Sequence, residues 1–388
     1  MWRHIASNAL TFLVVLIFLA GGVILWGQTQ YTAEGPLDEQ ICLRVQPGAT
    51  MRGVSRQLEA QNAVTNATIF RIGVDYADKT ALLKAGSWLI PENASMAEIS
   101  DIITRGGAST CGTEVVYRIG VTRQLVEVRE LDPATNRYVT LAEFSPAEEE
   151  APEEFVRVRA QGDTRYRVAI AEGVTSWQIV EGLKMADVLT GDLNEVPPEG
   201  SLAPDSYEVR AGDAREALIT RMRNAQDAYL AAAWEGRAPD LPLANPYEAL
   251  ILASIIEKET GVASERGQVA SVFTNRLRRG MRLQTDPTVI YGITGGEGVL
   301  GRGIRQSELR AATPYNTYVI EGLPPTPIAN PGRASIEAAV NPLETDYIFF
   351  VAASLNPADG HLFAETLEEH NANVALYRAL ERERDANQ

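Results

Sequence analysis

Histidine and cysteine are the scarcest chemically reactive residues of this 388-residue chain. The three histidines are His4, His361 and His370, and His4 precedes a long apolar run. A three-histidine zinc site in the folded part is therefore excluded, and two cysteines are too few for a cysteine-rich metal site or an iron–sulfur cluster. Catalysis must depend on carboxylates, amides, hydroxyls or arginines, and we expect no metal or organic cofactor.

Basic residues are also in deficit, with 35 Lys and Arg against 51 Asp and Glu, for a net charge of −16. Such a chain repels phosphate backbones, so nucleic acid is not an expected partner. A content of 45% hydrophobic and 22% charged residues is typical of a folded protein, and the length suits two or three domains.

Charge is absent from Ala9 to Trp26, a run long enough to span most of a hydrocarbon core about 30 Å thick. Arg3 precedes the run and acidic residues follow it, which favours a cytoplasmic N-terminus. A cleaved signal peptide is the alternative, although no A-x-A site follows directly. With either a membrane anchor or a cleaved signal peptide, we expect most of the chain to be exported. The anchor reading predicts a single-pass protein of the cell inner membrane with its C-terminal bulk in the periplasm.

Cys42 and Cys111 suit an oxidising compartment, where two cysteines can form a disulfide that brackets one candidate domain. Two buried free thiols are the alternative. Between them, a strand near Cys42 and a strand at Trp88 flank two short helical patterns. This strand–helix–helix–strand order resembles the LysM glycan-binding fold. A degenerate module that serves only as a spacer is the alternative.

The fold class expected from these patterns is α+β. Alternating residues predict strands after Cys111, including one at 155–160 (FVRVRA), around a solvated acidic loop. The expected segments are a cytoplasmic N-terminus (1–8), a transmembrane anchor (9–26), a linker (27–41), a LysM-like module (42–110), a β-rich insertion with an acidic loop (111–169), a mixed α/β domain (170–376) and a charged tail (377–388).

One helix of the α/β domain carries the candidate acid. Asn245 and Pro246 open it, and Gly261 closes it. At about 100° per residue, Glu259 falls inside the apolar stripe and Glu257 falls on the opposite side. Desolvation would raise the pKa of Glu259 and make it a candidate general acid. A frayed, solvated glutamate or an ion pair is the alternative.

The next helix, expected from Glu265 to Arg279 with Ser264 as its cap, places Arg276 at the centre of its apolar stripe. A buried arginine needs a carboxylate or an anionic ligand. A structural pair with Glu259 or Asp286 is one reading. In the other, Arg276 positions a catalytic carboxylate or contacts a substrate carboxyl group.

Loops rich in proline and glycine are expected after Gly280. Their polar and aromatic residues can bind a neutral, hydroxyl-rich ligand such as a sugar, and ordinary turn chemistry is the alternative. The candidate binding or supporting residues are Gln284, Asp286, Tyr315, Asn316 and Tyr318.

Three long motifs make the domain recognisable: ILASIIEKETGVASERGQVASVFTNRLRRGMRLQTDPTVIYG, TPYNTYVIEGLPPTPIANPG and GHLFAETLEEHN. Together they closely resemble the MltG (YceG-like) endolytic murein transglycosylases, densely over roughly residues 240–375. The anchor and the LysM-like module fit that family's layout. The strands at 115–165 and the Cys42/Cys111 pair depart from its most familiar members and leave the middle boundary open.

The resemblance implies cleavage of MurNAc-β-1,4-GlcNAc bonds within nascent peptidoglycan strands without water, leaving 1,6-anhydroMurNAc ends. The family's catalytic acid, the second glutamate of EKET, is Glu259 here, and this one carboxyl acts as acid and then as base. The implied partners are glycan strands and peptidoglycan synthases, with the membrane contacted through the N-terminal helix. Two alternatives stay open: a non-catalytic glycan-binding scaffold, and a hydrolytic muramidase that uses Glu257 or Asp286 as a second carboxylate.

Overall fold

The computed structural model describes residues 2–386 and has a mixed α+β architecture. The chain forms two compact units, which are described separately below. Unit 1 comprises Met1–Val115, Glu127–Phe144 and Glu150–Arg165, and unit 2 comprises Val116–Val126, Ser145–Glu149 and Tyr166–Gln388.

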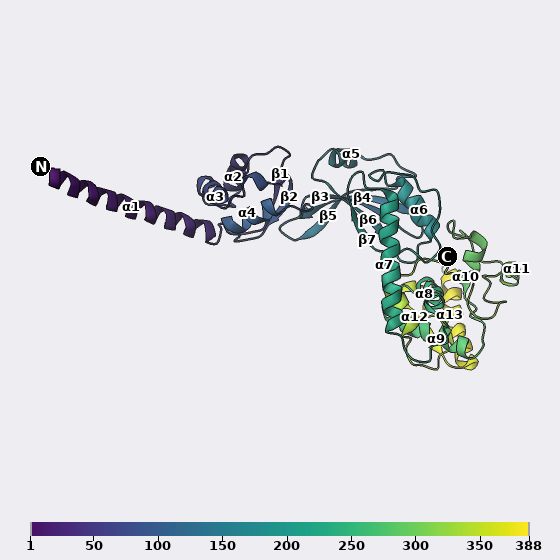
Figure 1. Ribbon diagram of the computed structural model, residues 1–388. Helices are drawn as coiled ribbons and strands as arrows, with labels where there is room; N and C mark the ends of the chain where they lie inside the picture. The colour runs from purple at the N-terminus through teal and green to yellow at the C-terminus, as the bar shows by residue number, and fades with distance from the viewer. Residues whose placement is uncertain (1, 387–388) are drawn as a thin grey trace. The chain divides into compact units, whose positions relative to one another are not determined.

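Unit 1 begins with α1 (Trp2–Thr32), a single long helix (Figure 1). Its segment Thr11–Thr32 is long and apolar enough to cross a membrane and is not buried by the protein. Residues 27–41, which were expected to form a linker, are instead helical through Thr32 and then pack on the module. The Gly35 N–H donates to the carbonyl oxygen of Asn93 at 3.0 Å, and the Leu37 side chain is buried.

The following module has the strand, helix, helix, strand order expected from the sequence. Strand β1 pairs antiparallel with β2, with Ile41 opposite Ile90. A capping box of Ser95 and Glu98 begins the last helix. The likeness of this module to LysM stays a prediction. Its elements are β1 (Ile41–Val45), α2 (Met51–Ala60), α3 (Ala67–Tyr76), η1 (Thr80–Leu82), β2 (Gly86–Ile90) and α4 (Met96–Arg105).

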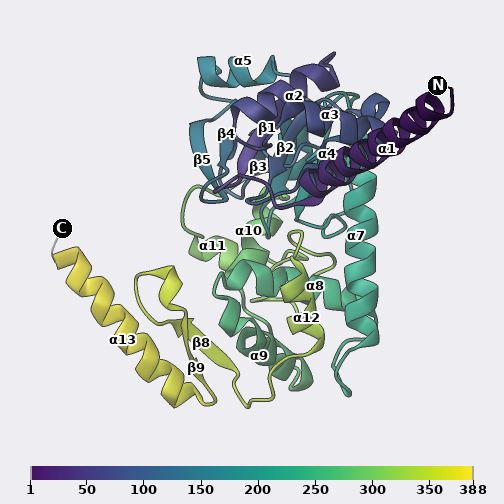
Figure 2. The ribbon, with the colours of Figure 1, turned by 90° about the vertical axis from the view of Figure 1, so that its left-hand side faces the viewer.

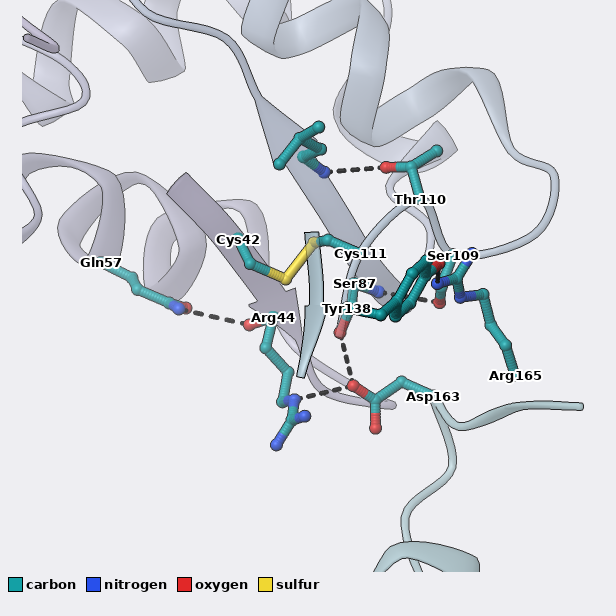
Figure 3. The surroundings of a disulfide bond; sticks show 11 residues. Cys42, Arg44, Gln57, Ser87, Ser109, Thr110, Cys111, Tyr138, Asp163 and Arg165 are labelled. Atoms are coloured by element: carbon teal, nitrogen blue, oxygen red, sulfur yellow. Dashed lines mark hydrogen bonds and ion pairs between the residues drawn. A yellow bond between two sulfur atoms is a disulfide. The ribbon is translucent and has the colours of Figure 1, made fainter. Parts of the chain in front are cut away.

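A disulfide joins Cys42 of β1 to Cys111, with the two Cα atoms 5.8 Å apart (Figure 3). It links the first strand of the module to the segment that follows α4. Beside it, the Arg44 guanidinium forms an ion pair with Asp163 at 2.7 Å. The Ser87 carbonyl accepts the N–H of Thr110 at 2.8 Å. Both ends of the module are therefore tied at one place.

The middle of the chain supplies most of a five-stranded sheet in the order β5-β4-β3-β6-β7. The strand expected at 155–160 is wrong, because residues 155–159 lie in helix α5 (Glu153–Arg159) and Ala160 caps its end. Acidic residues in its first turn and Arg157 near its end suit the helix dipole, and Phe155 and Val158 are buried at a spacing of three. The strands are β3 (Thr113–Ile119), β4 (Gln124–Asp132), β5 (Arg137–Phe144), β6 (Arg165–Ile170) and β7 (Ser206–Val209).

Unit 2 is organised around α8, which packs against α7, α9 and α12 (Figure 2). Two expectations are corrected here. Residues 286–294 form a helix, with Pro287 in its first turn, where a loop was expected. The residues expected to form a charged tail continue helix α13 as far as Ala386. The elements after β6 are α6 (Ser176–Met185), α7 (Arg215–Glu235), α8 (Pro246–Glu259), η2 (Ala263–Glu265), α9 (Arg266–Arg278), α10 (Asp286–Thr294), α11 (Gln306–Leu309), α12 (Arg333–Val340), β8 (Phe349–Ala352), η3 (Pro357–Asp359), β9 (His361–Ala364) and α13 (Leu367–Ala386).

We expect the double variant Cys42→Ser/Cys111→Ser to destabilise the module. The disulfide closes a loop of 69 residues, for which the chain-entropy model gives about 4 kcal/mol. Native-state hydrogen exchange of the amides of β1 and β2 in the whole chain measures this loss. Reductant should lower the protection of the wild type and leave the double variant unchanged. Equal protection in the oxidised wild type and the variant would contradict the prediction.

Candidate functional site

The candidate acid lies at the C-terminal end of α8, and the start of that helix is built as the sequence predicts. The Asn245 side chain accepts the N–H of Glu248 at 3.0 Å, and Pro246 occupies the first turn. Residues 249–256 are all buried, so α8 is apolar on every side rather than amphipathic. The helix ends at Glu259, where the helix dipole disfavours a negative charge.

Glu257 does not lie on a polar face, because its side chain is only 6% exposed. Its carboxylate accepts the Gly332 N–H at 3.0 Å and lies 3.8 Å from the guanidinium of Arg266. Arg266 also pairs with Glu172 at 3.2 Å. The negative charge of Glu257 is therefore compensated by a cation and a backbone donor.

Glu259 is partly accessible to solvent, and protein atoms crowd it enough for burial to raise the pKa of its carboxyl. The Thr285 hydroxyl donates a hydrogen bond to its Oε1 atom, which opposes the rise in pKa. The charge of Asp286 adds to the rise, whereas the charges of His361 and Arg276 reduce it. The net effect is a carboxyl that holds its proton to a higher pH than an ordinary glutamate.

Arg276 is buried on α9, and its N–H groups bind backbone carbonyls rather than a carboxylate. Its Nε donates to Ile348 at 2.7 Å and its Nη1 donates to Leu283. Its guanidinium also lies 5.6 Å from the ring centroid of Phe349. Burial lowers the pKa of Arg276, and the charge of Glu259 acts in the opposite direction. Arg276 thus fixes the segment that leads into Thr285, the hydrogen-bond donor to Glu259.

The segment around Thr285 and its contacts bring three of the predicted residues, Gln284, Asp286 and Tyr318, close to Glu259. Gln284 is exposed, has a φ of 50°, and its N–H donates to the carbonyl of Thr317 at 3.1 Å. The N–H of Thr285 donates to the Thr317 hydroxyl at 3.0 Å. Asp286 begins α10, and its carboxylate accepts the Tyr318 hydroxyl at 2.7 Å. Burial and that carboxylate raise the pKa of Tyr318 above its ordinary value, so its hydroxyl remains a hydrogen-bond donor.

The structure gives Tyr315 and Asn316 different surroundings. Asn316 is fully buried, and its amide donates to backbone carbonyls within residues 308–311, so it holds the loop together. Tyr315 is partly exposed, with its ring centroid 5.1 Å from that of Tyr291 and its hydroxyl 2.8 Å from that of Thr326. These two residues therefore shape a loop, and sugar binding by either stays a prediction.

His361 was not among the residues expected at the site. Its N–H donates to Glu265 at 2.7 Å, and its ring Nδ1 lies 3.0 Å from the other oxygen of that carboxylate. The same Glu265 carboxylate accepts the Thr260 hydroxyl at 3.4 Å, so His361 shares a partner with the residue next to Glu259. The charge of His361 lowers the pKa of Glu259. Helical spacing could not find it, because His361 lies on β9, outside the helix that carries Glu259. The GHLFAE motif was the available signal.

Within residues 2–386, no group of three or more His, Cys, Asp or Glu side chains is arranged to hold a metal ion. The groups gathered at the site are one carboxyl with a raised pKa, a hydroxyl donor, and nearby carboxylate, phenol and imidazole groups. Such a set can perform acid–base chemistry on a neutral ligand.

The YceG-like family model matches residues 114–376, which is more than half of the chain. The chain belongs to the YceG-like family. It is 27% identical over 382 residues to an endolytic murein transglycosylase of Streptococcus pneumoniae, covering 96% of this chain and 65% of that relative's length. It is 26% identical over 367 residues to an endolytic murein transglycosylase of Bacillus subtilis, covering 92% of this chain and 91% of the relative.

A crystal structure of a yceG-like protein from Listeria monocytogenes is also similar, at 26% identity and a TM-score of 0.45. The alignment covers 86% of this chain and 98% of that structure. All three motifs quoted above lie inside the segment matched by the YceG-like family model.

We expect Glu259 to titrate above the ordinary pKa of glutamate, and its neighbours to move that pKa in opposite directions. Asp286→Asn removes a negative charge and should lower the pKa of Glu259. Thr285→Val removes the hydrogen bond that stabilises the anion and should raise it. Carbon-13 NMR of glutamate carboxyls, assigned by subtraction of Glu259→Gln, measures these shifts. Shifts with the same sign in both variants would contradict the assignment.

We expect Arg276→Ala to lower the free energy of unfolding by roughly 2–4 kcal/mol, because two buried carbonyls lose a charged donor. Arg276→Lys should be intermediate, since one ammonium cannot reproduce the guanidinium geometry. The exposed Arg279→Ala is the matched control on the same turn and should change it by less than about 0.5 kcal/mol. Denaturant unfolding measures all three.

A positioning role also predicts a change that lost stability alone does not. The pKa of Glu259 should rise in Arg276→Ala, because the cation that favours the anion is removed. An unchanged pKa of Glu259 would mean that Arg276 is only structural.

Proposed function

We propose that this protein is a membrane-anchored endolytic lytic transglycosylase that cleaves MurNAc-β-1,4-GlcNAc bonds within peptidoglycan strands. The observation that carries the proposal is the state of Glu259, a partly accessible carboxyl whose pKa is raised by burial at the end of a rigid helix. Such a group is protonated at a higher pH than a solvated glutamate and can act as a general acid.

Membership in the YceG-like family and the relatives named endolytic murein transglycosylases support this substrate and reaction. The chain spans about 65% of the length of the Streptococcus pneumoniae relative and 91% of the Bacillus subtilis relative. The activity is therefore inferred from the site and the family together.

In the proposed reaction, Glu259 donates its proton to the glycosidic oxygen while the bond between that oxygen and C1 of MurNAc breaks. The sugar passes through an oxocarbenium-like state. The carboxylate then takes the proton from the C6 hydroxyl of the same MurNAc as O6 bonds to C1. This step closes the 1,6-anhydro ring and restores the carboxyl. The raised pKa serves both steps, because the carboxylate formed is a stronger base than an ordinary glutamate.

The contacts of the neighbouring carboxylates support a mechanism with one reacting carboxyl. Glu257 is engaged by Arg266 and the Gly332 N–H, which leaves it little freedom to act on a substrate. Asp286 accepts a hydrogen bond from Tyr318, and its charge helps keep Glu259 protonated. We infer that Asp286 and Tyr318 support the acid, and that Gln284 and Tyr315 contact the glycan.

The membrane anchor is the second part of the proposal. The apolar segment Thr11–Thr32 of α1 supports it, and Arg3 before the segment favours an N-terminus in the cytoplasm with the remaining chain in the periplasm. An enzyme held at the inner membrane can reach strands as they are made, and peptidoglycan synthases are the proposed partners.

A hydrolytic muramidase is the competing chemistry. The charge of Asp286 acts on the pKa of Glu259, so a second carboxylate lies close enough to affect the same reaction. If Asp286 activated a water molecule, the product would carry a reducing end instead of an anhydro ring.

A glycan-binding scaffold is the competing class of function. The β1-α2-α3-β2 order of the module favours it, because that order is the one expected of LysM. In that case deletion of the module should abolish the cellular phenotype, and Glu259→Gln should leave it unchanged.

The deciding experiment incubates the whole chain in detergent with purified sacculi and identifies the new strand ends by mass spectrometry. We expect 1,6-anhydroMurNAc ends from the wild type. Glu259→Gln should lower their rate of formation at least about 100-fold, since it removes the general acid. Glu257→Gln, two residues earlier on the same helix, is the matched control and should give the same product from its folded fraction. Reducing ends from the wild type would indicate the muramidase, and equal anhydro ends from Glu259→Gln would refute the catalytic role.

A further inference from the structure

Helix α3 of the module has an apolar face that the protein does not cover. The side chain of Ile72 is 62% exposed and that of Tyr76 is 84% exposed, with Ile69 one turn earlier on the same face. A continuous apolar face on an otherwise packed helix usually marks a binding surface.

This face of α3 forms one wall of a groove of about 810 Å³, and the C-terminal part of α1 forms the other. The α1 wall includes Val23, Ile24 and Trp26, which belong to the segment that can cross a membrane. Every residue that lines the groove within the described chain is uncharged. The polar members, such as Gln28 and Thr29, lie on α1 beyond the apolar run.

The two walls are held together by close contacts. The Tyr31 hydroxyl of α1 donates to the Ser100 hydroxyl of α4 at 2.8 Å. The ring of Tyr31 packs directly over Gly73 of α3, where a Cβ atom would come within 2.3 Å of it. Because glycine allows this close approach, α3 is fixed beside the end of α1 and cannot swing freely from a flexible linker.

We propose that the Ile72/Tyr76 face of α3 rests in the interfacial layer of the bilayer that α1 crosses, and that lipid fills the groove between the two helices. This inference rests on the membrane anchor proposed above. Residues 23–26 end the apolar run of α1, after which polar residues such as Gln28 and Thr29 follow, so they lie at the edge of the hydrocarbon core. Side chains that face them across the groove lie at the same depth.

The chemistry of the face suits that depth. Tyrosine is enriched at membrane–water interfaces, where its ring contacts acyl chains and its hydroxyl contacts headgroups and water. Isoleucine gains free energy when it leaves water for an apolar environment. The face therefore adds a second membrane contact to the anchor and sets the orientation of the module on the membrane surface.

The experiment uses the whole chain in lipid nanodiscs, with single cysteines labelled by an environment-sensitive fluorophore and doxyl-labelled lipids as quenchers. The native cysteines are joined in a disulfide, so the label reacts with the introduced residue. The test variants are Ile72→Cys and Tyr76→Cys on α3. Arg52→Cys, exposed on α2 and outside the groove, is the matched control, and Leu16→Cys reports whether α1 lies in the bilayer.

We expect quenching at positions 72 and 76 at least about twofold above that at position 52, with strong quenching at position 16. Quenching at 16 with positions 72 and 76 equal to 52 would overturn the membrane contact of α3 and leave the anchor standing. No quenching at 16 would overturn the anchor and this inference together, whereas the transglycosylase chemistry of Glu259 is tested separately with sacculi.

Discussion

The site depends on one carboxyl at the end of a buried helix, whose negative charge the surrounding groups balance only in part. Glu259 ends α8, and the Thr285 hydroxyl donates a hydrogen bond to it. That hydroxyl is held in place by Arg276, which binds the carbonyl of Leu283 two residues earlier and the carbonyl of Ile348 directly before β8. The core around α8 therefore stabilises the unit and also fixes the position of Glu259, whose carboxyl holds its proton to a higher pH than an ordinary glutamate.

What distinguishes Glu257 from Glu259 is how far neighbouring groups balance the negative charge, rather than how deeply the side chain is buried. Both lie in the last turn of a helix that is apolar on every side, and Glu257 is the one engaged by a cation and a backbone N–H. A buried carboxylate needs partners of this kind. Within residues 2–386, the hydrogen bond that Glu259 accepts comes from the Thr285 hydroxyl, and the negative charge of Asp286 works against its ionisation. The same motif thus provides one carboxylate bound by a cation and one carboxyl with a raised pKa.

Local sequence signals predicted the helix that carries the acid because its start depends only on neighbouring residues. Asn245 and Pro246 begin α8, as expected. The signals failed where two periodicities compete. Residues 155–160 alternate like a strand and yet form α5, because Pro152 and two glutamates begin a helix whose Phe155 and Val158 are buried on one side. Asp286 and Pro287 begin α10 for a similar reason, although proline and glycine nearby favoured a loop.

The sequence alone determined which chemical groups are available: few histidines, two cysteines, an apolar N-terminal run, and Glu259 at the end of a capped helix. Those properties depend on composition and on contacts within one or two helical turns. Only the tertiary structure decided that Glu257 is neutralised by Arg266, that Arg276 binds carbonyls rather than a carboxylate, and that His361 joins the site from β9. It also placed α3 beside the end of α1. Each of these depends on groups far apart in the chain, and their distances and desolvation are set only when the elements pack.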